Sequence, residues 1–525
     1  RWATDRIGDK GVIGFVTNSS FIDKTTLDGF RKSLYDEFNY LYIFNLRGAI
    51  RGKVGDFAKI EGQNIFDILT GVTISILVKD GSDHHKLFYH DIGDYLSRKA
   101  KFEQITNFQS IQNIDWQQLV PDANNDWLNQ KDPNYQRYLP LTDDSGQGIF
   151  PNSAVGISTN RDNWVYGFSK SATLKNSETL INHYNIEQNR LAPYHTQDKQ
   201  NRLDRASNYI KWSPKLESDF YRNKKLNFQN GYVRLGLYRP FTKKWLYYDS
   251  GVIERPGKYY QQFGDHNEVI FTTGRGARRE FSALATDLVP NMDTLEKAQG
   301  FMRYNNESTD GSLIPVERDN VSEAFAKKLG MTKDEAYAYV YGVLNLPAYQ
   351  TKYANDLKKD LARIPILKGK EEFAKIGQTL LDLHINYEQV DPYQEILING
   401  LSYSEFIHGQ HDYTVKEMKH EKVRNEAGKS VSDLSMIIYN SGIKITHIPL
   451  RAYDYVVNGK PAIEWILDQY QIKTDKASGI IDDPNQFSED KRYIFDLLLK
   501  VISVSLKTLD LMAQLPTFQV VVGDK

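Results

Sequence analysis

The first 80 residues alternate apolar runs with one amphipathic segment, and this pattern limits the fold more than any other feature. Val12 to Val16 predicts a strand, and the apolar residues between Leu27 and Phe38 keep helical spacing. Two further strands are predicted at Tyr40 to Phe44 and at Val72 to Val78. Strand, helix, strand, loop and strand form part of an α/β sheet, but three strands are too few for a complete doubly wound domain.

The remainder of the chain predicts a mixed fold. Residues 121–163 are rich in Asn, Asp, Gly and Pro, which is typical of a linker or an irregular surface segment. Between residues 164 and 290 we expect short strands that alternate with turns, whereas 334–361 and 489–512 have helical spacing. A chain of 525 residues is long enough for about two to four domains.

Composition narrows the class of protein. No run of eighteen apolar residues is present, so no membrane span is expected, and the start does not resemble a signal peptide. The absence of Cys excludes disulfides, argues against structural zinc and fits a reducing compartment. Because Arg1-Trp2-Ala3 opens without Met and has the pattern of a helix interior, we expect the chain to be a fragment of a longer polypeptide.

A basic and aromatic segment lies within a chain whose net charge is only −1. From Arg202 to Lys244, eleven Lys and Arg residues stand against three acidic residues, with eight aromatic residues among them. Cations neutralise phosphates and flat rings stack on bases, so this segment favours nucleic-acid binding; the alternative is a solvated face above core aromatics. Arg239, next to Pro240, is predicted to be structural. The predicted DNA contacts are Arg205, Lys211, Trp212, Lys224 and Lys225.

A second cationic run, TTGRGARRE, extends from Thr272 to Glu280. Glycine permits close approach of the backbone, and arginine suits guanine edges or phosphates. We therefore predict DNA contacts for Arg275, Arg278 and Arg279, with a charged helix start as the alternative. A further basic cluster, from Lys416 to Arg424, is predicted to be a surface loop.

Two motifs that could carry metal or acid–base chemistry are predicted to be structural. His408, His411 and Asp412 form His-x-x-His-Asp, but without a Glu general base or an apolar helix around them we expect a loop without metal. The DDPN peptide that begins at Asp482 is expected to form an Asx turn before the final helix. No metal site is predicted anywhere in the chain.

Six peptides together resemble the C-terminal part of Type ISP restriction-modification enzymes. Enzymes of that family are single polypeptides with a nuclease, a helicase-like ATPase, a coupler, an N6-adenine DNA methyltransferase and a target recognition domain. The matching peptides are spread over nearly the entire chain. They are Gly11–Asp23, Asn64–Asp80, Tyr238–Asp249, Ile364–Leu367, Tyr455–Ile466 and Ser478–Asn485.

The resemblance implies a fold of the class α/β plus α+β. Residues 1–105 would be the C-terminal part of a class I methyltransferase, with a partial Rossmann-like sheet. Residues 106–163 would be a linker or extension. Residues 164–525 would be a large mixed α+β target recognition domain, with lobes at 164–330 and 331–525.

The implied function is sequence-specific recognition of duplex DNA, with presentation of a target adenine for N6 methylation by S-adenosylmethionine. Asn18, Ser19, Ser20 and Phe21, after the first strand, would form a wall of the pocket for the flipped base. ATP and Mg²⁺ would bind to upstream nuclease and helicase segments of the same polypeptide. A bacterial cytoplasmic location without a membrane partner is implied.

The sequence departs from the complete enzymes at two motifs. The methyltransferase catalytic loop, Asn-Pro-Pro-Tyr/Phe, is absent because the chain contains no Pro-Pro pair, and no Walker phosphate loop is present. The chain alone is therefore expected to be inactive. The alternative function is a binding or scaffolding module for carbohydrate or protein that does not bind DNA, which the high aromatic content permits.

Overall fold

The computed structural model describes residues 2–50, 59–143, 145–257, 263, 267–307, 316–424, 428 and 430–521. These residues form two compact units, Arg1–Asp132 and Pro133–Lys525. The division falls inside the segment 121–163 that the composition predicts as a linker, and inside the wider linker or extension, 106–163, that the resemblance implies. The domain limits at 105 and 163 stay predictions.

A five-stranded sheet organises the first unit, in the order β1-β3-β2-β4-β5. β3 runs antiparallel to both β1 and β2, whereas β2 and β4 are parallel. The three strands predicted from the sequence are confirmed, and they are neighbours in this sheet. The strands are β1 (Gly11–Asn18), β2 (Tyr40–Asn45), β3 (Val72–Lys79), β4 (Lys86–Asp91) and β5 (Gln117–Leu119).

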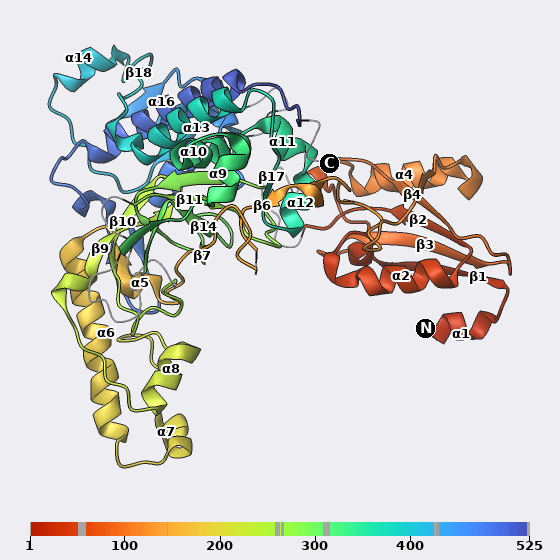
Figure 1. Cartoon of the computed structure of the whole chain (residues 1–525), viewed down its shortest axis with the longest axis horizontal. Helices are drawn as coiled ribbons and strands as arrows, with labels where there is room; N and C mark the ends of the chain where they lie inside the picture. The colour runs from red at the N-terminus through yellow and green to blue at the C-terminus, as the bar shows by residue number, and fades with distance from the viewer. Residues whose placement is uncertain are drawn as a thin grey trace. The chain divides into compact units, whose positions relative to one another are not determined.

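Helices cover both faces of this sheet (Figure 1). On the side of α2 (Asp28–Glu37), the buried cluster includes Ile43 of β2 and Leu77 of β3. On the side of α4 (Arg98–Phe108), it includes Phe44 of β2. Neighbouring residues of one strand therefore serve opposite cores, as the alternation of a pleated strand requires. A short helix, α1 (Trp2–Ile7), precedes β1.

Three larger sheets are present among the described residues of the second unit. Their orders are β13-β9-β10-β8, β12-β11-β14-β7 and β19-β18-β22-β21-β20. Their strands are β7 (Ala154–Val155), β8 (Tyr166–Gly167), β9 (Val233–Arg239), β10 (Thr242–Tyr247), β11 (Val269–Thr272), β12 (Ala283–Thr286), β13 (Val289–Pro290), β14 (Gln299–Met302), β18 (Leu397–Ile398), β19 (Leu401–Ser402), β20 (Lys419–Arg424), β21 (Ser430–Ile438) and β22 (Lys444–Thr446).

Short two-stranded pairs complete the strands of this unit. They are β6 (Leu139–Pro140) with β17 (Arg363–Ile364), β15 (Tyr304–Glu307) with β16 (Val316–Asp319), β23 (Val456–Val457) with β24 (Lys460–Pro461), and β25 (Lys473–Thr474) with β26 (Ile481–Asp482). The helices outside residues 162–221 are α9 (Glu323–Leu329), α10 (Lys333–Leu344), α11 (Pro347–Lys352), α12 (Ala354–Lys359), α13 (Lys370–Ile385), α14 (Tyr403–Ile407), α15 (Ala462–Gln469) and α16 (Tyr493–Gln514). Helical structure is therefore confirmed within both predicted segments, 334–361 and 489–512.

α10 and α13 approach each other so closely that glycine is required at the contact. A Cβ atom on Gly377 would lie 2.0 Å from the carbonyl oxygen of Ala338, and one on Gly342 would lie 2.5 Å from that of Phe373. A capping box between Thr332 and Glu335 begins α10, and every residue from Ala336 to Leu344 is buried. This pair forms the middle of one of the two large cores of the unit.

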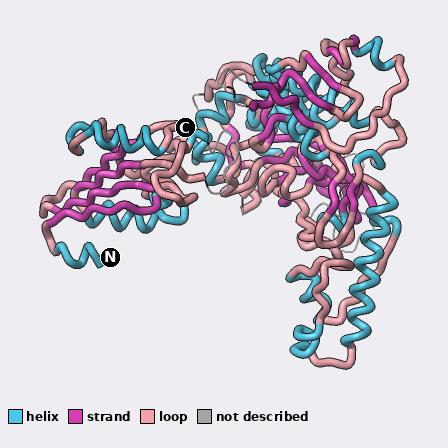
Figure 2. Tube along the Cα trace, turned by 180° about the vertical axis from the view of Figure 1, so that it is seen from behind, coloured by secondary structure: helices cyan, strands magenta, loops and turns pink. Residues whose placement is uncertain are grey.

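The expectation of strands and turns throughout 164–290 is wrong for residues 170–221. After α5 (Asp162–Val165) and the short strand β8, that segment contains three helices, α6 (Lys170–Leu191), α7 (Thr196–Arg202) and α8 (Pro214–Tyr221). α6, α7 and α8 project together from the rest of the second unit, and we call them the helical arm (Figures 1 and 2). α6 is mainly polar, so hydrophobic periodicity could not reveal it, although Ser169 caps its first turn by accepting from the Ala172 backbone N–H.

No helix of the described residues combines the length and the apolar composition that crossing a bilayer requires.

Candidate nucleic-acid interface

The aromatic residues of the basic segment hold the helical arm together. Trp212 meets the ring of Phe220 edge-on, with centroids 5.2 Å apart, and lies 5.7 Å from Tyr184 of α6. The indole nitrogen of Trp212 donates to the carbonyl oxygen of Asp204 at 2.8 Å. The Trp212 ring thus packs α8 against α6, and Trp212 also lines a surface hollow together with Glu217 and Arg222.

Some predicted phosphate contacts on the arm already have acidic partners. Arg205 donates to Glu217 at 3.0 Å, and this hydrogen bond raises the pKa of the guanidinium. Lys224 lies 3.4 Å from a carboxylate oxygen of Asp219. Lys211 and Lys225 are exposed, and among the described residues neither ammonium group makes a hydrogen bond or ion pair. Of the five predicted contacts in the basic segment, these two lysines therefore carry the positive charge that has no internal partner among the described residues.

The predicted arginine contacts lie on a loop between β11 and β12, not on a helix. At Gly274 the loop passes so close to Lys297 that a Cβ atom would lie 2.1 Å from the Lys297 carbonyl oxygen. One carboxylate oxygen of Glu296 accepts from the backbone N–H groups of Arg278 and Arg279, each at 3.0 Å. We call residues 274–279 the arginine loop. Its conformation is fixed by the close approach of Gly274 to Lys297 and by the backbone hydrogen bonds to Glu296.

Glu296 also binds the side chain of Arg278, which belongs to the arginine loop. Its second carboxylate oxygen accepts from Nε of Arg278 at 3.0 Å. Burial alone would raise the pKa of Glu296, but the hydrogen bonds from Arg279 and Arg278 bring it below its usual value. Glu296 is therefore a charged anchor, and no motif in the sequence marked it.

Arg279 is held by a segment that is distant in sequence. Its guanidinium donates to the carbonyl oxygen of Asn458 and lies 6.0 Å from the ring centroid of Trp465. Arg275, by contrast, is exposed and makes no side-chain hydrogen bond or ion pair within the described part of the chain. Of the three predicted arginines, Arg275 is therefore the one whose guanidinium has no internal partner among the described residues.

Two lysines at the end of the basic segment form ion pairs within the protein and are not free to bind a ligand. Nζ of Lys244 lies 2.6 Å from a carboxylate oxygen of Asp482, above the rings of Phe168 and Tyr238. Burial lowers the pKa of Lys244, and the Asp482 charge opposes that shift. Lys243 pairs with Glu388 at 3.3 Å. The charge density counted in the sequence therefore overstates the cationic surface.

Arg239 is structural, as predicted. Its guanidinium lies 4.0 Å from the centroid of the Tyr238 ring and donates to Oδ1 of Asn291 at 3.2 Å. The DDPN peptide confirms the Asx turn, because Oδ1 of Asp483 accepts from the Asn485 backbone N–H at 3.0 Å. Asp482 has the further role as partner of Lys244, which the sequence did not indicate.

The residues predicted to line a base pocket follow β1 directly. Asn18 ends the strand, and its Oδ1 accepts from the backbone N–H of Ser20 at 2.7 Å. Ser19 and Ser20 are partly exposed. Phe21 is buried and meets the rings of Phe30 and Trp127 edge-on, at 5.6 and 5.9 Å. Asn18, Ser19 and Ser20 therefore lie at the surface end of the strand, whereas the Phe21 ring belongs to the core.

The His-x-x-His-Asp motif makes local contacts. The His411 ring stacks on Phe406 at 3.8 Å, and its Nε2 lies 2.9 Å from the Phe406 carbonyl oxygen. Asp412 accepts from the Thr414 backbone N–H at 2.9 Å. Within the described ranges, no group of three or more His, Asp or Glu side chains is arranged to hold a metal ion.

The prediction of a surface loop at 416–424 is wrong. Residues 419–424 form β20, which pairs with β21 in an antiparallel ribbon. The many charges of this segment suggested a loop. In a two-stranded ribbon, however, successive side chains point to opposite faces, and both faces can be exposed to water, so a strand can carry charges at consecutive positions.

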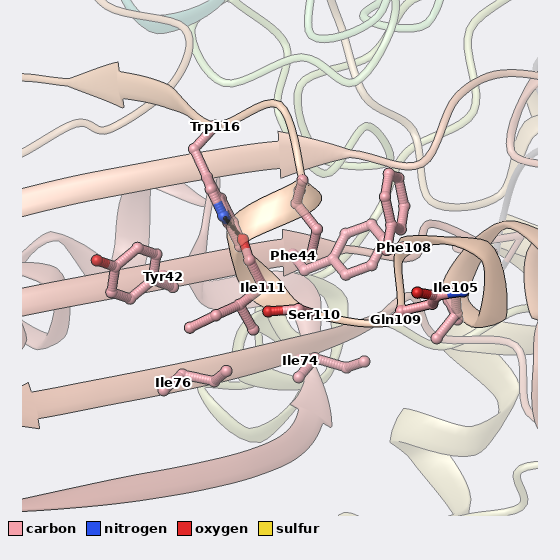
Figure 3. Close-up of a pocket in the computed structure, with 11 residues that line it drawn as sticks. Tyr42, Phe44, Ile74, Ile76, Ile105, Phe108, Gln109, Ser110, Ile111 and Trp116 are labelled. Carbon is pink, nitrogen blue, oxygen red and sulfur yellow. Dashed lines mark hydrogen bonds between the residues drawn. The ribbon is translucent and has the colours of Figure 1, made fainter.

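An apolar cavity of about 180 Å³ lies in the first unit, between the sheet and α4 (Figure 3). Phe44 and Ile74 of the strands form its floor, and Phe108 and Trp116 close its sides (Figure 3). No Lys, Arg, Asp or Glu lines it. A cavity without charged groups does not suit a polyanion, so it is not a candidate site for nucleic acid.

A family model and several solved structures are similar to this chain. A family model described as the Type ISP C-terminal specificity domain matches residues 148–497. A nuclease-deletion mutant of the Type ISP restriction-modification enzyme LlaGI, solved with a DNA substrate mimic, is 44% identical, with a TM-score of 0.81 over 99% of this chain and 48% of that chain. No curated protein matches the chain.

Two further solved structures are similar over nearly the whole chain. The ATP-dependent Type ISP enzyme LlaBIII bound to DNA is 37% identical, with a TM-score of 0.82 over 99% of this chain and 34% of that chain. A DrdV–DNA complex is 27% identical, with a TM-score of 0.78 over 99% and 52%. The chain therefore spans between a third and about a half of these proteins. The chain belongs to the Type ISP restriction-modification family, and residues 148–497 match the C-terminal specificity domain of that family.

Proposed function

We propose that this chain recognises a specific sequence in duplex DNA as part of a restriction-modification enzyme. The observation that carries the proposal is the similarity over nearly the whole chain to two Type ISP enzymes solved with DNA or a DNA mimic. The free cations at Lys211, Lys225 and Arg275 support it, because phosphate neutralisation supplies much of the affinity of DNA-binding proteins. Arg275 is the candidate for reading a base edge.

We also propose that the first unit is the C-terminal part of an N6-adenine methyltransferase. The sheet of a class I methyltransferase ends in a reversed hairpin. The strand order β1-β3-β2, with β3 antiparallel to both neighbours, supports this role because it has that arrangement. Asn18, Ser19 and Ser20 would then present hydrogen-bonding groups to a flipped adenine. Upstream segments of the same polypeptide would supply the catalytic loop and the ATP- and Mg²⁺-dependent activities, in a bacterial cytoplasm.

S-adenosylmethionine is the methyl donor that this proposal implies, and the residues of this chain do not fit it by themselves. The glycine loop and the Asn-Pro-Pro-Tyr/Phe loop are absent from the sequence. The apolar cavity between the sheet and α4 offers no charged group for the methionine part of the donor. No methyl-transfer step is therefore assigned to residues of this chain.

Electrophoretic mobility shift with a labelled pool of randomised duplexes, at 50 and 200 mM salt, tests the DNA proposal. Binding should weaken as the salt concentration rises. For each phosphate contact, the logarithm of the association constant should fall by about 0.9 for every tenfold increase in salt. Selection from the pool should enrich one sequence. If no duplex shifts at the lower salt, the chain does not bind DNA, and a carbohydrate- or protein-binding module becomes the better description.

A further inference from the structure

The ribbon of β20 and β21 extends beyond the sheet to which it belongs. Among the residues that the structure describes, β22 pairs with β21 only at Ile437 and Ile438. Beyond a register shift between His420 and Glu421, residues 421–424 pair only with 430–433 within the described part of the chain. This outer part, which we call the ribbon, therefore has two strands and two faces that no third strand restricts.

The two faces of the ribbon differ in charge. Side chains of directly opposed residues in an antiparallel pair lie on the same face. Lys422 opposes Ser432 and Arg424 opposes Ser430, so one face carries two cations and two hydroxyl groups. All four of these residues are exposed, and Nζ of Lys422 donates to Oγ of Ser432 at 2.8 Å. We call this the cationic face.

The opposite face carries Glu421 and Asp433 together with two valines. Glu421 forms an ion pair with Lys444 of β22, so this face is turned toward the sheet. Asp433 accepts from the side chain and backbone of Ser435, and these bonds lower its pKa. The carboxylates thus have partners of their own. Among the described residues neither Lys422 nor Arg424 makes an ion pair.

The base of the ribbon is anchored to the segment that also braces the arginine loop. Nε2 of His420 lies 2.6 Å from Oε1 of Glu464 in α15, and its Nδ1 lies 3.1 Å from the Met436 carbonyl oxygen. Asn458, whose carbonyl oxygen accepts from Arg279, lies six residues before Glu464. One short segment therefore holds both cationic elements.

We propose that the cationic face of this ribbon is a second contact surface for duplex DNA, with the ribbon lying in the major groove. The inference rests on the proposed DNA recognition and names an element that carries it. A major groove about 12 Å wide admits a two-stranded ribbon. Four residues of an extended strand reach about 10 Å from the first Cα to the last. Lys422 and Arg424 would bind phosphates or guanine edges, and Ser430 and Ser432 would bind base edges.

Charge removal is the first test. Fluorescence anisotropy with a labelled 40-base-pair duplex pool would compare the chain with the double variant Lys422→Ala/Arg424→Ala across 50–200 mM salt. The slope of log affinity against log salt should fall by about two, because each lost phosphate contact contributes about 0.9. The control Lys375→Ala/Lys507→Ala removes the same charge from α13 and α16, and it should keep the slope of the original chain.

Two adjacent residues on opposite faces provide the sharper test. Ser432→Glu adds a negative charge to the cationic face, and Val431→Glu adds the same charge to the other face. Ser432→Glu should weaken duplex binding at least tenfold more than Val431→Glu, with both melting temperatures close to that of the original chain. Equal effects, or an unchanged slope in the double variant while the original chain binds, overturn the ribbon contact alone. Failure of the original chain to bind any duplex overturns the proposed function as well.

Discussion

Asn458 fixes Arg279 from a position 179 residues further along the chain. Its carbonyl oxygen accepts from the Arg279 guanidinium, and its Oδ1 accepts from the Glu296 backbone N–H at 3.0 Å. Its own backbone N–H donates to Oγ of Ser282 at 2.9 Å. Asn458 also has a left-handed backbone, with φ of 53°, which Asn adopts more readily than most residues. The turn at Asn458 and Gly459, both with positive φ, therefore supports a candidate DNA-binding loop.

Asn458→Ala is expected to lower stability and relax sequence preference together. The variant leaves the Glu296 N–H without its acceptor, which costs about 1–3 kcal/mol for a buried donor. It also places Ala at a left-handed position. Urea denaturation measures the first effect, and enrichment from a randomised duplex pool measures the second. Asn458→Gly is the control, because it keeps the backbone conformation and removes only the amide; if it behaves like the original chain, the hydrogen bond has no role.

Lys225→Ala is expected to weaken binding to all duplexes alike. Lys225 is exposed and makes no ion pair among the described residues, so it can bind a phosphate without breaking an internal contact. The salt slope should fall by about one, as for the loss of a single phosphate contact. Lys215→Ala, ten residues earlier in α8, is the matched control, since Lys215 already pairs with Asp219 at 3.1 Å. A change in sequence preference with the slope intact would contradict a phosphate role.

The sequence predicted the sheet of the first unit because its strands are apolar runs of ordinary length. It did not predict the helical arm, where α6 buries only some of its residues and shows little periodicity. Residue counts also could not separate Lys244, which is buried against Asp482, from Lys225, which is free. That difference depends on partners hundreds of residues away. Glu296 and Asn458 were missed for the same reason, since their roles exist only in the folded chain.

Lys244→Ala is expected to destabilise the second unit by about 3 kcal/mol, since it leaves a largely buried carboxylate without its partner. Asp482 would lose its ion pair while its other oxygen still accepts from the Phe168 backbone N–H at 2.9 Å. Urea denaturation measures the loss. The double variant Lys244→Met/Asp482→Asn should recover part of it, because both charges are removed. If stability is unchanged and the salt slope falls instead, Lys244 contacts DNA and the structural assignment is wrong.

Acid should destabilise the protein through His384, which burial keeps neutral. Burial lowers its pKa from 6.5 to about 3, and Tyr341 and Thr508 contact its two ring nitrogens. The unfolded chain binds the proton more tightly, so the stability due to neutral His384 is complete above pH 6.5 and is lost as the pH falls. The loss approaches about 1.4 kcal/mol per pH unit below 6.5. Unfolding at pH 7.5 and 5.5 should show a smaller decrease for His384→Asn; equal decreases would contradict the assignment.

Gly377→Ala should disrupt the contact between α10 and α13. The added methyl group would lie 2.0 Å from the Ala338 carbonyl oxygen, so the two helices must separate. Overpacking of this kind costs about 1–3 kcal/mol, and a backbone oxygen cannot move aside as a side chain can. Gly29→Ala in α2 is the control, because nothing lies within 4 Å of its Cβ position. Replacing Gly at this exposed helix position should stabilise the protein by up to about 1 kcal/mol. Differential scanning calorimetry should therefore give melting temperatures that shift in opposite directions, and a shift of the same sign in both variants would contradict the close helix contact.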